Sequence, residues 1–263
     1  MQIFVRRGDI LGDLFLPEPK AANGIGIVWC PGLPNNPVAE DMGAPLAAEG
    51  FTVLQARYPG SWQSYGTFGP RSSLAGAITG LELLAGGTAQ DLGSLSQVTW
   101  SLNRLALVGN SYGGAVAVCA LACSALADAA VAFCPFLDPP AQNADPAQTE
   151  EDVSGLYDYL QRCHANVFRG MDWVEWQDFL QGRSVLYPPA YRDRLGNRPL
   201  LLVHGETDET IRAYHTTAFH QSLLDQGAGK PEIILVEGVG HGRALRAAAW
   251  GHWTQWLHGI EVP

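Results

Sequence analysis

The segment Arg104-Leu-Ala-Leu-Val-Gly-Asn-Ser-Tyr-Gly-Gly114 decides the fold of this chain. Its continuous apolar start predicts a strand buried on both faces, and the alanine-rich residues 115–126 that follow predict a helix. Between them stands Gly-x-Ser-x-Gly, in which Gly109 and Gly113 leave room for a sharp turn around Ser111. Such a turn would place the Ser111 hydroxyl at the carboxyl end of the sheet, near the positive end of the following helix.

Strands and helices alternate along the rest of the chain in the same way. Apolar runs predict strands over residues 25–30, 51–58, 104–108, 129–133, 199–203 and 232–236, with an antiparallel edge strand over 12–17. Helical patterns cover residues 41–49, 73–84, 115–126, 212–226 and 245–257. Strands that are apolar throughout and are separated by helices predict an α/β fold with a doubly wound, mostly parallel sheet.

Residues 138–190 interrupt this alternation. Strand-like runs are absent there, aromatic residues collect, and nine acidic residues stand against three arginines. Helical patterns over 149–163 and 172–181, together with the length of the segment, favour a small helical cap over a structureless loop. We therefore expect a single domain over residues 1–263 with a helical cap insertion at 138–190.

Composition and charge exclude several classes of function. The 263 residues are 47% hydrophobic, which is enough to build a large core. The formal net charge of −10 argues against a nucleic-acid partner, because phosphate binding needs clustered basic side chains. No run approaches the ~20 apolar residues that a membrane-spanning helix needs, so no membrane partner is expected. The N-terminus carries charges where a signal peptide would be apolar.

The five cysteines are odd in number and stand mostly in apolar runs. That usage predicts a reduced, cytoplasmic protein rather than a disulfide framework. Cys119 and Cys123 have the i,i+4 spacing of a helical ligand pair, but no second pair accompanies them, which favours packing over metal binding.

Two further residue types complete a catalytic pattern with Ser111. A serine hydroxyl needs a base to remove its proton, and the base needs an orienting partner. Asp208 follows the predicted strand over 199–203, and His241 follows the one over 232–236 on a glycine-flanked loop. Each of the three residues therefore stands just past a predicted strand, in the chain order Ser, Asp, His.

These motifs resemble the α/β-hydrolase superfamily, over residues 12–257 apart from the cap. The segment 109–114 looks like its nucleophile elbow, and 240–242 looks like its catalytic-histidine turn. His-Gly-Glu-Thr-Asp-Glu-Thr-Ile, 204–211, resembles the acid loop of the dienelactone-hydrolase and prolyl-oligopeptidase-like branches, although Ser replaces the dienelactone-hydrolase Cys and no propeller precedes. The resemblance implies an α/β-hydrolase sheet with Ser111 as nucleophile, His241 as general base and then acid, and Asp208 as its orienter.

An oxyanion hole follows from the same comparison. The tetrahedral intermediate needs two backbone N–H donors, and Tyr112, next to the nucleophile, should supply one. The second should come from the loop after residue 30, where many relatives read His-Gly and this chain reads Pro31-Gly-Leu-Pro34. Leu33 is the candidate, because the prolines have no N–H to donate.

Other residues compete for these roles. His204 ends a buried run and is interpreted as a structural histidine, whereas Glu206 and Glu209 flank Asp208 and are alternative acids. For substrate binding, the candidates are aromatic residues of the cap and of the loop after residue 58; packing within the cap is the alternative. We name Trp62, Tyr65, Trp173 and Trp176.

The sequence thus predicts a serine hydrolase that cleaves a small-molecule carboxylic ester, thioester or amide through an acyl-serine, without cofactor or metal. A peptidase, an acyltransferase or a cyclase using the same three residues remains open, as does a non-catalytic ligand-binding protein on a hydrolase fold. Whether the chain forms a homodimer is also open.

Overall fold

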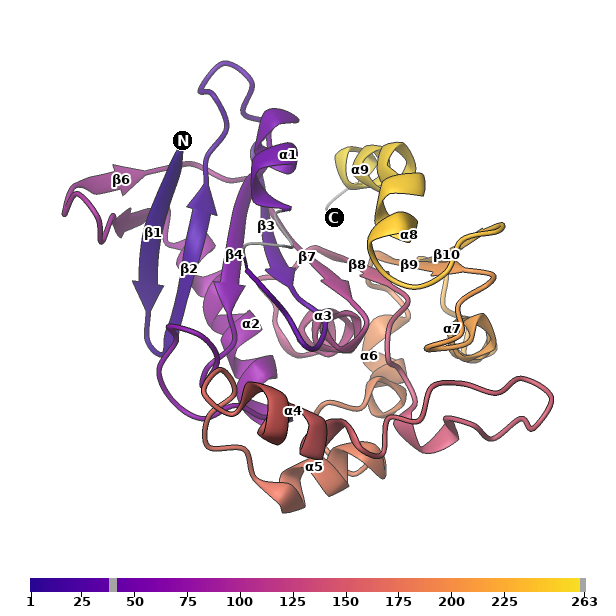
Figure 1. Ribbon diagram of the computed structural model, residues 1–263. Coiled ribbons are helices and arrows are strands. Elements are labelled where there is room, and N and C mark those ends of the chain that lie inside the picture. The colour runs from indigo at the N-terminus through magenta and orange to yellow at the C-terminus, as the bar shows by residue number, and fades with distance from the viewer. Residues whose placement is uncertain (38–41, 261–263) are drawn as a thin grey trace.

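Eight strands form one sheet (Figure 1). The computed structural model describes residues 1–37 and 42–260. In spatial order the strands are β1 (Gln2–Arg7), β2 (Ile10–Phe15), β4 (Thr52–Arg57), β3 (Ile25–Cys30), β7 (Arg104–Asn110), β8 (Ala129–Phe133), β9 (Leu200–Gly205) and β10 (Pro231–Val236). All neighbours from β4 to β10 pair in parallel, while β1 and β2 are antiparallel. The predicted doubly wound, mostly parallel sheet is confirmed.

Helices cover both faces of the sheet, each with its own apolar core. On one face pack α2 (Pro70–Ala85), α3 (Tyr112–Cys123), α6 (Arg192–Leu195) and α7 (Ala213–Leu224). On the other face lie α1 (Gly43–Ala48), α8 (Arg243–Ala248) and α9 (Trp250–Gly259). A hairpin, β5 (Thr88–Gln90) with β6 (Gln97–Thr99), stands beside β1. No helix in the described part of the chain is long and apolar enough to cross a membrane.

The N-terminal edge of the sheet differs from the prediction. The strand expected over 12–17 is β2, which lies inside the sheet, and the edge strand is β1. In β1 the alternating residues Ile3 and Val5 are buried while Gln2 and Arg7 are exposed. Such alternation is typical of a strand with one solvated face, and the two adjacent arginines hide it in the sequence.

The helix expected over 245–257 is two helices, α8 and α9, that meet at Ala249. The apolar stripe of Leu245, Ala249, Trp253 and Leu257 nevertheless stays buried across the break. A break that keeps the same face toward the sheet leaves the periodicity of the sequence unchanged, so periodicity alone missed it. The helix expected over 41–49 is α1, which begins at Gly43; Asp41 lies outside the described residues.

The segment 138–190, here called the cap segment, holds η1 (Pro139–Ala141), α4 (Leu156–His164), α5 (Trp173–Leu180) and the start of η2 (Pro188–Tyr191). Figure 1 shows α4 and α5 beside each other at one end of the sheet. Asp172 begins α5 as an N-cap, accepting from the Glu175 N–H at 2.8 Å. The helix expected over 149–163 begins only at Leu156, because residues 149–153 run along another loop, as described below.

Candidate active site

Ser111 stands at a strained turn between β7 and α3. Its φ of 55° lies in the left-handed region, which costs a non-glycine residue about 1–3 kcal/mol. The flanking glycines permit the turn: a Cβ on Gly109 would lie 2.1 Å from the Gly113 carbonyl oxygen, and one on Gly113 would lie 2.0 Å from the Cys30 carbonyl oxygen. The Ser111 N–H donates to the Phe133 carbonyl at 2.9 Å, which ties the turn to the end of β8.

Asp208 and His241 meet at the same edge of the sheet. Asp208 follows β9 with a fully buried side chain, and its Oδ2 accepts a hydrogen bond from His241 Nδ1 at 2.7 Å. The other carboxylate oxygen, Oδ1, accepts from the N–H groups of Thr210 and Ile211 at 2.9 and 3.0 Å. Burial raises the pKa of Asp208, but hydrogen bonds from His204 and His241 lower it more. The pKa of this carboxyl is therefore well below its ordinary value.

The competing residues lie elsewhere or serve the structure. His204 is buried: its Nδ1 lies 2.7 Å from Thr216 Oγ1, and its Nε2 lies 2.8 Å from the Ile211 carbonyl and 3.3 Å from Asp208 Oδ2. Glu206 and Glu209 are exposed, and the carboxylate that His241 contacts belongs to Asp208.

The sequence did not single out Cys134, although it touches the imidazole of His241. Its Sγ lies 3.8 Å from His241 Nε2 and 3.6 Å from Asn110 Oδ1. Among the described residues, Ser111 and His241 form no direct hydrogen bond. Burial lowers the pKa of His241, whereas Asp208 and Cys134 raise it more, to about 10. The signal that could have revealed Cys134 is its place directly after β8, the neighbour of β7 in the sheet.

A cavity of about 420 Å³ opens beside Ser111. Apolar residues form much of its wall, and two acidic residues, Glu151 and Asp152, contribute to the side built by the cap segment. The full lining is Leu33, Pro34, Ser111, Tyr112, Phe136, Glu151, Asp152, Val153, Gly155, Leu156, Tyr159, Thr210 and Ile211.

Leu33 and Tyr112 both line this cavity. Tyr112 begins α3, where a backbone N–H has no partner within the helix. In the described part of the chain, neither the Leu33 N–H nor the Tyr112 N–H donates to a protein acceptor. The assignment of these two N–H groups to an oxyanion hole stays a prediction.

The four aromatic residues predicted to bind substrate do not line the cavity. Trp176 is buried and stacks on the Tyr112 ring at 6.0 Å, so it belongs to the core of the cap segment. Trp62 donates through Nε1 to Asn35 Oδ1. Tyr65 and Trp173 are 61% and 48% exposed on the surface, where Tyr65 lies under the Arg6 guanidinium. An aromatic residue type does not by itself distinguish a pocket from a core.

Metal ligand atoms come together at one place in the described residues. Cys134, Asp208 and His241 offer atoms within 4.8 Å of one another. Two of these three residues, Asp208 and His241, are joined by the 2.7 Å hydrogen bond described above. Cys119 is buried and Cys123 exposed on α3, and both are free thiols.

A mostly parallel sheet covered by helices on both faces, with a strained serine turn after β7, is the fold of an α/β hydrolase. The model of the alpha/beta hydrolase family matches residues 26–250, so the chain belongs to this family of hydrolases. A comparison with curated protein sequences gave no match.

Solved structures of esterases and peptidases share the fold. An acylaminoacyl peptidase from Pyrococcus horikoshii is 18% identical with a TM-score of 0.63, covering 97% of this chain and 39% of that one. A puromycin hydrolase is 18% identical with a TM-score of 0.64, covering 100% and 39%. Est1E from Butyrivibrio proteoclasticus is 15% identical with a TM-score of 0.63, covering 97% and 98%. The chain thus spans less than half of the first two and nearly all of the third.

Proposed function

We propose that this protein is a serine hydrolase that cleaves a small-molecule carboxylic ester, thioester or amide through an acyl-Ser111 intermediate. The observation that carries the proposal is the 2.7 Å bond between Asp208 Oδ2 and His241 Nδ1 at the sheet edge where Ser111 turns. In the neutral imidazole that bond favours the tautomer with the lone pair on Nε2, the form a general base requires.

Each step of the reaction then has a group to perform it. Ser111 Oγ attacks the substrate carbonyl carbon while its proton passes to His241 Nε2, which turns from Cys134 toward Ser111. The carbonyl oxygen becomes an oxyanion that the N–H groups of Leu33 and Tyr112 bind, each contributing roughly 3–4 kcal/mol to the lowered barrier. His241 returns the proton to the leaving group, and a water repeats the sequence to release the acid and restore Ser111.

The absence of a direct bond between Ser111 and His241 in the described structure is compatible with this mechanism. Catalytic hydrogen bonds are often long without substrate and tighten when it binds. A movement of the imidazole from Cys134 Sγ to Ser111 Oγ would retain the Asp208 bond if the ring turns about its Nδ1 end.

Covalent labelling tests the proposal directly. The protein is treated with a fluorophosphonate, and the adduct is located by peptide mass spectrometry. We expect one adduct at Ser111, none in Ser111→Ala, and normal labelling in Ser101→Ala, which removes an exposed serine remote from the cavity. Folded wild-type protein that stays unlabelled at Ser111 would overturn the proposal.

A second candidate function is cleavage of amino-acyl amides or esters. It is favoured by Glu151 and Asp152, two acidic residues that line the cavity and whose negative charge would attract a substrate ammonium group. A panel of p-nitrophenyl esters and aminoacyl p-nitroanilides separates the two. The second candidate is supported if wild type cleaves the aminoacyl p-nitroanilides faster than the neutral esters and if Glu151→Gln and Asp152→Asn lose this preference. It is excluded if wild type prefers the neutral esters and both variants keep that preference.

A further inference from the structure

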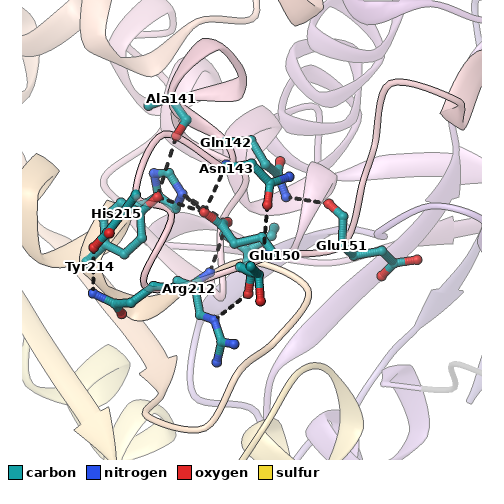
Figure 2. Close-up of polar contacts among 12 residues, drawn as sticks. Ala141, Gln142, Asn143, Glu150, Glu151, Arg212, Tyr214 and His215 are labelled. Carbon is teal, nitrogen blue, oxygen red and sulfur yellow. Dashed lines mark hydrogen bonds and ion pairs between the residues drawn. The ribbon is translucent and has the colours of Figure 1, made fainter.

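The Glu150 side chain is fully buried, in a segment whose other acids are exposed or half-buried. Burying a carboxylate is costly unless donors surround it. The Tyr214 hydroxyl donates to Oε1 at 2.7 Å, and His215 Nε2 lies 2.8 and 2.9 Å from the two oxygens (Figure 2). The backbone N–H groups of Arg212 and Asn143 donate at 3.2 and 3.3 Å. Burial raises the pKa of Glu150, but these donors lower it more, so it falls below its ordinary value.

The residues around Glu150, 142–153, here called the strap, run beside the loop that carries Asp208. Gln142 Nε2 donates to the Thr210 carbonyl at 2.9 Å, and the Glu151 N–H donates to the Glu209 carbonyl at 3.1 Å. Arg212 Nε donates to the Thr149 carbonyl at 2.9 Å. Figure 2 shows Gln142, Glu151 and Arg212 around Glu150. The strap and the loop are therefore joined along their length, with the Glu150 carboxylate as the buried centre of the joint.

The same strap supplies one wall of the cavity. Glu151, Asp152 and Val153 line it directly after Glu150, and Thr210 and Ile211 line it from the loop. Glu150 itself is absent from the lining, because its side chain is taken up by Tyr214 and His215. It therefore touches neither Ser111 nor the cavity, and it acts only through the strap.

We propose that Glu150 is a positioning residue that holds the strap wall in place and so sets the length of acyl chain that the cavity accepts. This inference rests on the proposed function, since it assumes that the cavity holds the acyl group. A short acyl group reaches few atoms of the strap wall and gains little from its position. A long acyl group packs against Val153 and its neighbours, so its binding weakens when the wall is released.

The test compares p-nitrophenyl acetate with p-nitrophenyl octanoate in wild type, Glu150→Ala and Glu150→Gln. In Glu150→Ala we expect KM for the octanoate to rise by about tenfold, equivalent to about 1.4 kcal/mol of binding, and kcat for the acetate to change less than about twofold. Glu150→Gln should recover part of the loss, because an amide oxygen in the place of Oε1 still accepts from the Tyr214 hydroxyl and the Asn143 N–H. Asp158→Asn is the matched control: it removes an exposed charge from α4 in the same cap segment.

The ratio of octanoate to acetate kcat/KM is the deciding quantity, because partial unfolding lowers both values equally and leaves the ratio unchanged. A ratio in Glu150→Ala equal to that of wild type overturns the inference. If Glu150→Ala does not fold, Tyr214→Phe removes a single bond to the carboxylate and should lower the ratio by about threefold. Fluorophosphonate labelling separates the two ideas: an unlabelled wild type refutes the proposed function, whereas labelled variants with an unchanged ratio refute the Glu150 inference alone.

Discussion

Replacing Cys134 with alanine should shift the pH dependence of the reaction to lower pH. In the proposed mechanism, His241 must be neutral at Nε2 to accept the Ser111 proton. Burial lowers the pKa of His241, and the contacts with Asp208 and Cys134 raise it more, to about 10. The Cys134 sulfur, 3.8 Å from Nε2, is therefore one of the groups that keep the free imidazole protonated.

The size of the effect follows from the titration curve. With a pKa of about 10, roughly one His241 in a hundred is neutral at pH 8, so kcat/KM should rise about tenfold per pH unit up to that pKa. Cys134→Ala removes the sulfur and keeps Asp208, so the pKa falls but stays above its ordinary value. Each unit of that fall raises kcat/KM at pH 8 by about tenfold. The limiting rate at high pH should not change.

The assay is kcat/KM for p-nitrophenyl acetate from pH 6 to 10.5, corrected for spontaneous hydrolysis. Cys119→Ala is the matched control, because it also removes a buried thiol, but one on α3 that makes no contact with His241. A Cys134→Ala profile that superimposes on that of wild type, or that moves to higher pH, would refute the reasoning.

Three other predictions test the site and its support. Asp208→Asn should lower kcat by about 10⁴-fold in ester hydrolysis, whereas Glu206→Gln should change it less than about twofold. Because the pKa of Glu150 is lower in the folded protein than its ordinary value of 4.5, its ionised carboxylate stabilises the fold at pH values above 4.5. This contribution to stability is lost as the pH falls below 4.5 and the carboxylate becomes protonated. Thermal unfolding from pH 6 to 3 should therefore depend less steeply on pH in Glu150→Gln than in wild type. Gly113→Ala, whose Cβ would meet a backbone oxygen, should lose more than about 3 kcal/mol in urea unfolding, whereas Gly251→Ala, with nothing within 4 Å, should not.

Sequence patterns predicted those parts of the molecule that depend on local chemistry. The Gly-x-Ser-x-Gly turn is readable because only glycines fit at 109 and 113, and strands such as β3 and β8 are readable because they are apolar throughout. Asp208 and His241 could be paired before any coordinates, because carboxyl ends of parallel strands share one sheet edge. Their 2.7 Å bond agrees with that expectation.

The remaining features depend on packing between distant segments. Cys134 reaches His241 because β8 lies beside β9, whose loop carries Asp208, the partner of His241. The sequence around Glu150 is typical of an exposed helix, which gives no sign that this carboxylate is buried. Its burial depends on Tyr214 and His215 of α7, which contact it. The same limit applies to Trp176, whose neighbour Tyr112 is more than sixty positions away in the chain.

The cap segment is attached to the sheet domain at several separate places. Phe168 bridges to Ser61, and the Arg169 N–H donates to the Gly60 carbonyl at 2.8 Å. Glu175 accepts from the Arg71 N–H of α2 at 2.7 Å, and the strap lies on the Asp208 loop. A cap segment that is held at separate places is not expected to rotate open about a single hinge. We therefore expect the turnover of an ester substrate to follow its dissolved monomer concentration, without a jump when the substrate forms micelles.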